Sequence, residues 1–168
     1  MLLRHGMRAA APVLSASRVS LLRSNIHIRG FDHVCVCVSD VDRSIAWYQG
    51  VLSMHHLHAD HPSFGKDPAF MRTATGGANV ALLPLSEGVP PIRNHNGAHF
   101  ALTISSDDFD DVAAELPKLL ERYRVGGEDG AVHSVEVDEQ DYGLQRSLFF
   151  EDPDRNIVEL TCWRNVDR

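Results

Sequence analysis

Apolar and polar residues alternate in two stretches of the chain, and each stretch is followed by a helical pattern. The first stretch covers residues 31–39 and precedes 40–52, and the second covers 97–105 and precedes 106–123. A period of two residues is typical of a strand with one buried face, whereas apolar residues three and four apart are typical of an amphipathic helix. The pattern predicts two strand–helix units, with His33 and His99 at matching positions.

Each unit continues through three further predicted strands, which makes a βαβββ module that occurs twice. In the first module the strands lie near 54–60, 69–74 and 79–83, and in the second near 132–137, 145–150 and 156–163. Placing Asn79 on Asn156 also places Leu82 on Glu159, so the repeat extends to its last strand. We therefore expect module one at 31–85, a Pro-containing linker at 86–96 and module two at 97–165. Ser106 is expected to cap the second helix and Pro117 to kink it.

The last predicted hairpin contains a carboxylate on an otherwise packable strand. Asp152, Pro153 and Asp154 form the turn, because proline fixes φ and aspartates bond their own backbone. Alternation places Glu159 with Ile157 on one face of the strand that follows. A buried, unpaired carboxylate costs several kcal/mol, so Glu159 requires a cation or a wet cavity.

Composition limits the classes of function. With 168 residues, 43% hydrophobic and 23% charged, the chain is typical of a soluble globular protein. Five of its 16 basic residues lie in residues 1–30, which contain no acid, so the body holds 11 basic against 23 acidic residues and has a net charge of −12. An acidic body argues against nucleic acid or a membrane as partner. Three cysteines, an odd number, fit a reducing compartment.

The first thirty residues resemble a targeting segment. They contain Arg4, Arg8, Arg18, Arg23 and Arg29, several serines and short apolar patches. The interpretation that we favour is an organelle presequence, for the mitochondrion before the plastid. A disordered basic tail on a cytoplasmic protein is the alternative.

The body resembles the vicinal oxygen chelate superfamily, which includes glyoxalase I, fosfomycin-resistance proteins, extradiol dioxygenases and bleomycin-binding proteins. The resemblance rests on the two βαβββ modules, on "FDHVCVCVSD" and "GAHFALTI", and on "LFFEDPDRNIVEL" at the end of module two. It implies an α+β fold with a cupped mixed sheet and helices outside. The cup closes within one chain or through modules exchanged in a homodimer.

The same resemblance implies that His33, His99 and Glu159 are the ligands of a divalent metal. Such a triad suits Fe, Mn, Ni or Zn and leaves positions free for a small-molecule substrate that chelates through two oxygens. Strand alternation agrees, because Val34, Val36 and Val38 form an apolar row and leave His33 on the other face. Glu159 is also the candidate catalytic residue.

Further residues are candidates for substrate contacts or for packing. Arg72 matches Phe149 in the repeat and could bind a carboxylate, and His56 and His58 share a strand face from which one could reach the cup. Cys35 and Cys37 are expected to be small buried packing residues.

The chain departs from the family's patterns at three positions. In glyoxalase I a glutamate ligand ends the first module, where this chain has Leu82, which makes typical glyoxalase activity doubtful. Extradiol dioxygenases usually carry a tyrosine where Phe149 lies, and the hairpin turn usually has glycine where Arg155 lies. The expected function is a metal-dependent lyase, isomerase or dioxygenase. The alternatives are a metal-free small-ligand binding protein of the bleomycin-resistance type and an interaction domain with a vestigial cup.

Overall fold

The structure is a computed structural model that describes residues 29–62, 65–77, 79–89, 97–124 and 134–164. The chain divides into two units, residues 1–30 and residues 31–168. The predicted presequence lies almost entirely outside the described residues, as does most of the predicted linker. No helix in the described ranges is long and apolar enough to cross a membrane.

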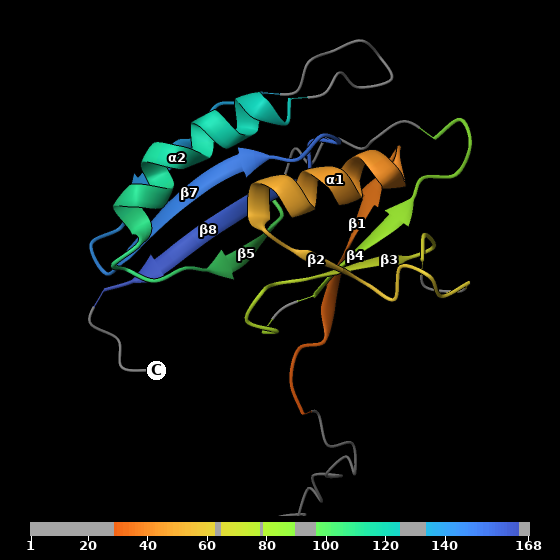
Figure 1. Cartoon of the computed structure of the whole chain (residues 1–168). Coiled ribbons are helices and arrows are strands. Elements are labelled where there is room, and N and C mark those ends of the chain that lie inside the picture. The colour runs from red at the N-terminus through yellow and green to blue at the C-terminus, as the bar shows by residue number, and fades with distance from the viewer. Residues whose placement is uncertain (1–28, 63–64, 78, 90–96, 125–133, 165–168) are drawn as a thin grey trace, which may run out of the picture. The chain divides into compact units, whose positions relative to one another are not determined.

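Module one is a four-stranded mixed sheet with one helix (Figure 1). Its elements are β1 (His33–Val38), α1 (Val41–Leu52), β2 (His55–Leu57), β3 (Ala69–Arg72) and β4 (Asn79–Pro84). The strand order is β1-β4-β3-β2, with β1 and β4 parallel and the other pairs antiparallel. The predicted βαβββ unit is therefore confirmed for this half of the body.

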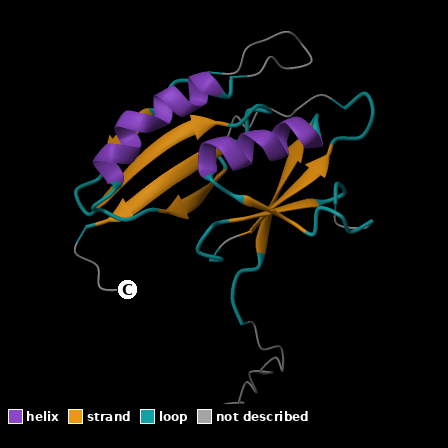
Figure 2. Cartoon of the chain, viewed as in Figure 1, coloured by secondary structure: helices purple, strands orange, loops and turns teal. Residues whose placement is uncertain are grey.

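Module two repeats the topology (Figure 2). Its elements are β5 (His99–Thr103), α2 (Phe109–Arg122), β6 (Asp138–Asp141), β7 (Gln145–Glu151) and β8 (Ile157–Trp163). The strand order is β5-β8-β7-β6, again with the first pair parallel and the others antiparallel. In Figure 1, α2 lies along the sheet that contains β7 and β8.

One predicted strand was placed wrongly. An apolar alternation predicts a strand near 132–137, of which 132–133 lie outside the described residues, whereas β6 begins at Asp138 and consists of polar residues. Among the strands that the structure describes, β6 lies at the edge of its sheet and pairs with β7 alone. Polar side chains suit an edge strand, so β6 has no apolar signal in the sequence.

The helix ends also differ in part from the prediction. Asp40 caps α1, since its side chain accepts a hydrogen bond from the Arg43 amide. The cap of α2 is Asp108, which makes no side-chain capping bond, so Ser106 is not the cap. The helix continues from Phe109 to Arg122 through Pro117.

Each sheet has one face that packs into the hydrophobic core, here called the core face, and one open face. Val36 and Val38 of β1 are buried in the core, and Cys35 and Cys37, which alternate with them, are exposed. On β8 the core face carries Val158, Leu160 and Cys162, as alternation predicts. The open face carries His33 in module one and His99 in module two.

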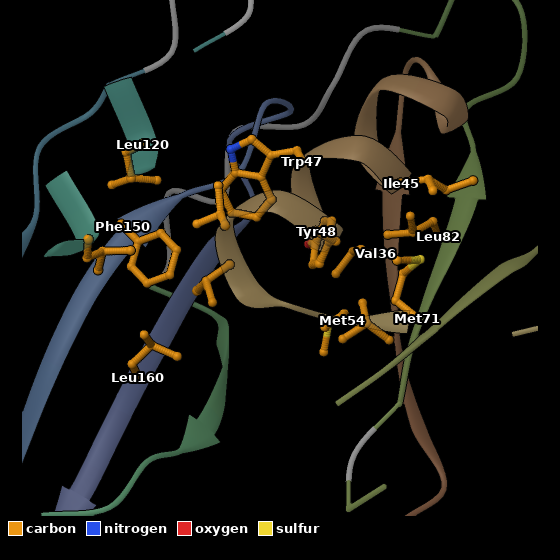
Figure 3. Packing of buried hydrophobic residues seen from close by; sticks show 14 of the residues in the cluster. Val36, Ile45, Trp47, Tyr48, Met54, Met71, Leu82, Leu120, Phe150 and Leu160 are labelled. Carbon is orange, nitrogen blue, oxygen red and sulfur yellow. The ribbon is translucent and has the colours of Figure 1, made fainter. Parts of the chain in front are cut away.

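The two modules share this core. Trp47 of α1 is 1% exposed, and its ring lies 6.2 Å from the ring of Phe150 on β7 (Figure 3). Ile45 of the same helix packs on the side of Leu82 in module one. Because α1 contributes to both halves, module one and module two are joined by apolar packing.

Hydrogen bonds from the β7–β8 turn also connect module two to module one. Asp154, 4% exposed, accepts hydrogen bonds from the Ser39 amide and from the Arg43 guanidinium, at 3.0 and 2.8 Å. Asp152, fully buried, accepts a bond from the Tyr48 hydroxyl at 3.0 Å. The turn that sequence predicted therefore has a structural role: its carboxylates bind module one.

Candidate metal centre

A histidine and a glutamate lie in contact on the open face of module two. The Nε2 atom of His99 lies 2.9 Å from Oε2 of Glu159, and the Glu159 side chain is 8% exposed. Parallel pairing sets Ala101 of β5 beside Glu159 of β8, which brings His99, two residues earlier, to the same face. The buried carboxylate thus has one imidazole beside it.

The atoms of this pair that do not face each other, Nδ1 of His99 and Oε1 of Glu159, each have a hydrogen-bond partner elsewhere. His99 Nδ1 lies 2.7 Å from the Gly97 carbonyl oxygen. Because a carbonyl only accepts, Nδ1 carries a proton and Nε2 is the atom that can face a cation. The Ser147 hydroxyl donates to Oε1 of Glu159 at 2.5 Å. Nε2 and Oε2 therefore point at each other, and only a proton or a metal ion can lie between them favourably.

On the open face of module one, a hydrogen bond at Nδ1 likewise orients the imidazole of His33. Its Nδ1 donates to Oδ1 of Asp32 at 2.6 Å, and its side chain is 35% exposed. A carboxylate on Nδ1 fixes the imidazole tautomer and leaves Nε2 as the ligand atom, which is the usual arrangement behind metal-bound histidine. Asn79 supports the segment by donating to the Asp32 carbonyl oxygen at 3.1 Å.

Each histidine ring also lies close to a phenylalanine ring and nearly perpendicular to it. The ring of Phe149 lies 5.4 Å from His99 at 87°, and the ring of Phe70 lies 5.3 Å from His33 at 86°. Phe149 pairs with Glu159, and Phe70 pairs with Ala81. The counterpart of Phe149 in module one is therefore Phe70, and the prediction that Arg72 holds this position is wrong.

The same pairings correct the position of the missing ligand. Cys35 pairs with Ala81 as Ala101 pairs with Glu159, so the counterpart of Glu159 is Ala81. Leu82 pairs with Val36 on the core face and is fully buried there. The prediction that Leu82 occupies the ligand position is wrong by one residue, and one residue exchanges the faces of a strand.

The structure does not bring the three predicted ligands together. Within the described ranges, no three His, Cys, Asp or Glu side chains are grouped closely enough to hold a metal ion. His99 and Glu159 are in contact, whereas His33 lies on the other sheet. A single chain of this structure thus presents two partial sites.

The other predicted contact residues lie around these partial sites. Arg72 is exposed on the open face of module one, where its Nε donates to Oδ1 of Asn79 at 3.1 Å. His56 pairs with Met71, which places His56 on the core face. The prediction that His56 could reach the cup is therefore wrong. The neighbouring His55 pairs with Arg72 and lies on the open face. His58 follows β2 with a φ of 52° and is not part of the strand.

Two features of the open faces differ from expectation or were missed. Cys35 and Cys37 are exposed and are not packing residues, because they share the face of His33. Sequence reasoning also missed Ser147, which is fully buried against Glu159. A serine two residues before Phe149, on a strand antiparallel to that of Glu159, is the signal that could have identified it.

A cavity of about 590 Å³ adjoins Phe149. Phe149 and Ile157 give it apolar walls, and Glu136, Asp138 and Glu151 contribute carboxylates. Because Phe149 contacts both this cavity and His99, the cavity lies next to the candidate site.

The fold and the open faces define a protein of paired βαβββ modules with a histidine–carboxylate site. Residues 30–160 match the family model of the Glyoxalase/Bleomycin resistance protein/Dioxygenase superfamily. The chain belongs to this superfamily, as its sequence resemblance predicted.

Individual relatives have diverse activities. The chain is 26% identical over 146 residues to metallothiol transferase FosB of Staphylococcus epidermidis, covering 85% of this chain and 88% of FosB. It is 30% identical over 132 residues to biphenyl-2,3-diol 1,2-dioxygenase 2 of Rhodococcus globerulus, covering 77% of this chain and 60% of the dioxygenase.

Solved structures agree on the fold. A glyoxalase/dioxygenase from Nostoc punctiforme is similar with a TM-score of 0.58 at 19% identity, covering 94% of this chain and all of the other. A point mutant of the fosfomycin resistance protein FosX from Listeria monocytogenes, solved with Mn(II) and 1S,2S-dihydroxypropylphosphonic acid, is similar with a TM-score of 0.57 at 20% identity, covering 83% of this chain and 95% of the FosX chain.

Proposed function

We propose that this protein is a metal-dependent enzyme that acts on a small oxygenated molecule through bidentate chelation to one divalent ion. The observation that carries the proposal is the contact between His99 Nε2 and Glu159 Oε2 at 2.9 Å, on an open sheet face. Imidazole nitrogen and carboxylate oxygen suit Fe, Mn, Ni and Zn. A lyase, isomerase or dioxygenase-like reaction fits this donor set, and the relatives are a transferase and a dioxygenase.

The residues fit such an ion. Glu159 is 8% exposed, and a carboxylate this deeply buried is stabilised by a cation. Both histidines present Nε2, because Nδ1 of His99 is held by a carbonyl and Nδ1 of His33 by a carboxylate. When bound, the ion would supply Lewis-acid polarisation of substrate oxygens and a template for their orientation.

We further propose that two copies of the chain complete the site. His33 and the His99–Glu159 pair lie on the open faces of different sheets, and the described residues of one chain contain no three-residue metal group. If module one of one copy covers module two of the other, His33 can meet His99 and Glu159 inside a cup. A symmetric dimer would contain two such sites, because exchange between identical chains is reciprocal.

The chain's own residues limit the reaction. Phe149 lies against His99 with its ring nearly perpendicular and has no hydroxyl to donate, which argues against the usual extradiol dioxygenase arrangement. Ala81 can neither bind an ion nor accept a proton, so isomerisation of a thiol hemiacetal is not expected. Arg72, exposed on the open face, is the candidate for binding an anionic group of the substrate.

A metal-free small-ligand binding protein is a second candidate, and one contact favours it. If His99 is protonated, its contact with Glu159 is an ion pair, which already compensates the buried carboxylate without a metal. The ligand would then occupy the cavity beside Phe149. Metal content separates the two functions.

The test is elemental analysis of the full chain after exposure to Mn, Fe, Ni and Zn, each followed by desalting. The proposal predicts about one ion per chain, as one triad per chain requires. His33→Ala, His99→Ala and Glu159→Ala should each remove it. His55→Ala is the matched control, since His55 shares the open face of module one with Arg72 but is not in the triad. A metal-free wild-type chain, or stoichiometry unchanged in all three variants, refutes the proposal.

A further inference from the structure

Glu159 is held on its far side by a serine that belongs to no predicted ligand set. The Ser147 hydroxyl lies 2.5 Å from Oε1 of Glu159 and is fully buried. The two residues lie on neighbouring antiparallel strands, where Ser147 pairs with Thr161 and Phe149 with Glu159. The serine is therefore the diagonal neighbour of the glutamate on the open face, within reach of a short side chain.

Behind this serine lies a second layer of hydrogen bonds. Ser147 Oγ is 3.1 Å from Oγ1 of Thr161, which is 4% exposed. Gln145 donates its amide to the same Thr161 oxygen at 2.8 Å. Thr161 donates its own proton to the Arg146 carbonyl oxygen at 3.1 Å, so its Oγ1 is an acceptor for Ser147. Ser147 has one proton for two acceptors, and the shorter contact, 2.5 Å to Glu159 against 3.1 Å to Thr161, favours the carboxylate.

The two oxygens of the Glu159 carboxylate have different partners. Oε1 accepts from Ser147, whereas Oε2 faces Nε2 of His99. Rotation of the carboxylate would break both contacts at once. An ion that binds beside His99 would therefore meet Oε2 as a single, preoriented ligand atom.

We propose that Ser147, supported by Thr161 and Gln145, is a positioning residue that holds Glu159 as a one-oxygen metal ligand. This inference rests on the proposed function, because it assigns Ser147 a role at that same site. Partners of metal ligands usually affect metal affinity roughly 10- to 100-fold when removed. The structure offers a closely matched comparison in Ser44, another fully buried serine beside a buried carboxylate, Asp154, at 3.4 Å.

The experiment is a titration of the full chain with Mn²⁺, followed by the electron paramagnetic resonance of free and bound ion. Ser147→Ala should weaken Mn²⁺ binding by roughly 10- to 100-fold and change the spectrum of the bound ion. Ser147→Thr, which retains the hydroxyl, should restore most of the affinity. Thr161→Val should give a smaller loss, and it serves as the second variant if Ser147→Ala fails to fold. Ser44→Ala should leave Mn²⁺ affinity unchanged.

Two results would overturn the inference, and a reference variant separates it from the proposed function. Wild-type affinity in both Ser147→Ala and Thr161→Val would show that the serine does not position Glu159. An equal loss in Ser44→Ala would show that affinity follows general stability. Glu159→Ala is measured alongside as the reference variant. If Glu159→Ala retains full Mn²⁺ affinity, the proposed function itself fails. If Glu159→Ala abolishes binding while Ser147→Ala binds as wild type does, only the positioning role is contradicted.

Discussion

Ala81 on β4 and Glu159 on β8 occupy equivalent positions in the two modules. Each lies on the open face of the last strand of its module, and each is paired with the third residue of the first strand, Cys35 in one case and Ala101 in the other. The neighbouring Leu82 lies on the opposite face, in the core. At the position in module one that corresponds to the ligand Glu159, the proposed cup therefore has only the methyl side chain of Ala81.

A glutamate should have opposite effects at these two adjacent positions. Leu82→Glu buries a charge in the core and should destabilise the protein by at least about 4 kcal/mol or prevent folding. Ala81 is also fully buried, but it pairs with Cys35 and Phe70 on the face opposite the core. Ala81→Glu should therefore cost less stability than Leu82→Glu and should tighten Mn²⁺ binding as an added ligand. Urea denaturation and Mn²⁺ titration of both variants provide the measurement. A folded Leu82→Glu variant that binds Mn²⁺ more tightly than Ala81→Glu would contradict the assignment of faces.

Arg155 in the β7–β8 turn adopts a left-handed backbone conformation with a φ of 66°. A side chain other than glycine costs roughly 1 to 2 kcal/mol in this region. Arg155→Gly should therefore be about 1 kcal/mol more stable than Arg155→Ala. The alanine variant is the control for loss of the arginine side chain, and chemical denaturation of both variants measures the difference. Equal stability of the two would show that the turn is not strained.

Asp152 should make stability depend on pH in the mildly acidic range. Burial raises the pKa of Asp152 from 3.8 to about 6, against hydrogen bonds from Asn156 and Tyr48 that lower it. The folded state then binds a proton more readily than the unfolded state, so this group's contribution to the free energy of unfolding falls as pH rises from about 4 to about 6. The total change is roughly 2 to 3 kcal/mol.

The measurement for Asp152 is urea denaturation between pH 4 and pH 7 for wild type and Asp152→Asn. The variant lacks the titrating group, so the difference in free energy of unfolding between wild type and variant should decrease as pH rises through this range. Asp60→Asn serves as a control because Asp60 is exposed. A constant difference between wild type and Asp152→Asn across the range would contradict the prediction.

Residues 1–30 should direct a fluorescent reporter into an organelle, with the mitochondrion before the plastid. The reason is five arginines and no acidic residue in that segment. Replacing Arg4, Arg8, Arg18 and Arg23 with glutamate should abolish import, and replacing them with lysine should preserve it. Microscopy of the three fusions is the measurement. A wild-type fusion that stays diffuse in the cytosol would refute the presequence.

Strand and helix patterns predicted much of the fold because each module has a buried and an open face. The alternation of Val34, Val36 and Val38 with His33 and Cys35 was sufficient to assign the faces of β1. The match of His33 with His99 identified the repeat. The contact between Glu159 and His99 follows from these faces, since both lie on the open side of adjacent strands.

Features that depend on register or on an edge strand were not predictable in the same way. Aligning Asn79 with Asn156 shifted the last strand of module one by one residue, which put Leu82 in place of Ala81 as the counterpart of Glu159. The same 77-residue offset put Arg72 in place of Phe70, two residues away, as the counterpart of Phe149. Only strand pairing fixes this register. Ser147 gave no motif, because its role depends on a hydrogen bond between strands.

The most direct test of a metal site shared between two chains is complementation between variants. His33→Ala and Glu159→Ala chains are purified metal-free, mixed under conditions that allow exchange of subunits, and analysed for bound Mn²⁺. A mixed dimer combines intact His33 from one chain with intact His99 and Glu159 from the other, so the mixture should bind Mn²⁺ although neither variant alone does. A mixture that binds no more metal than the separate variants, from a wild-type protein that binds it, would contradict a site completed by a second copy.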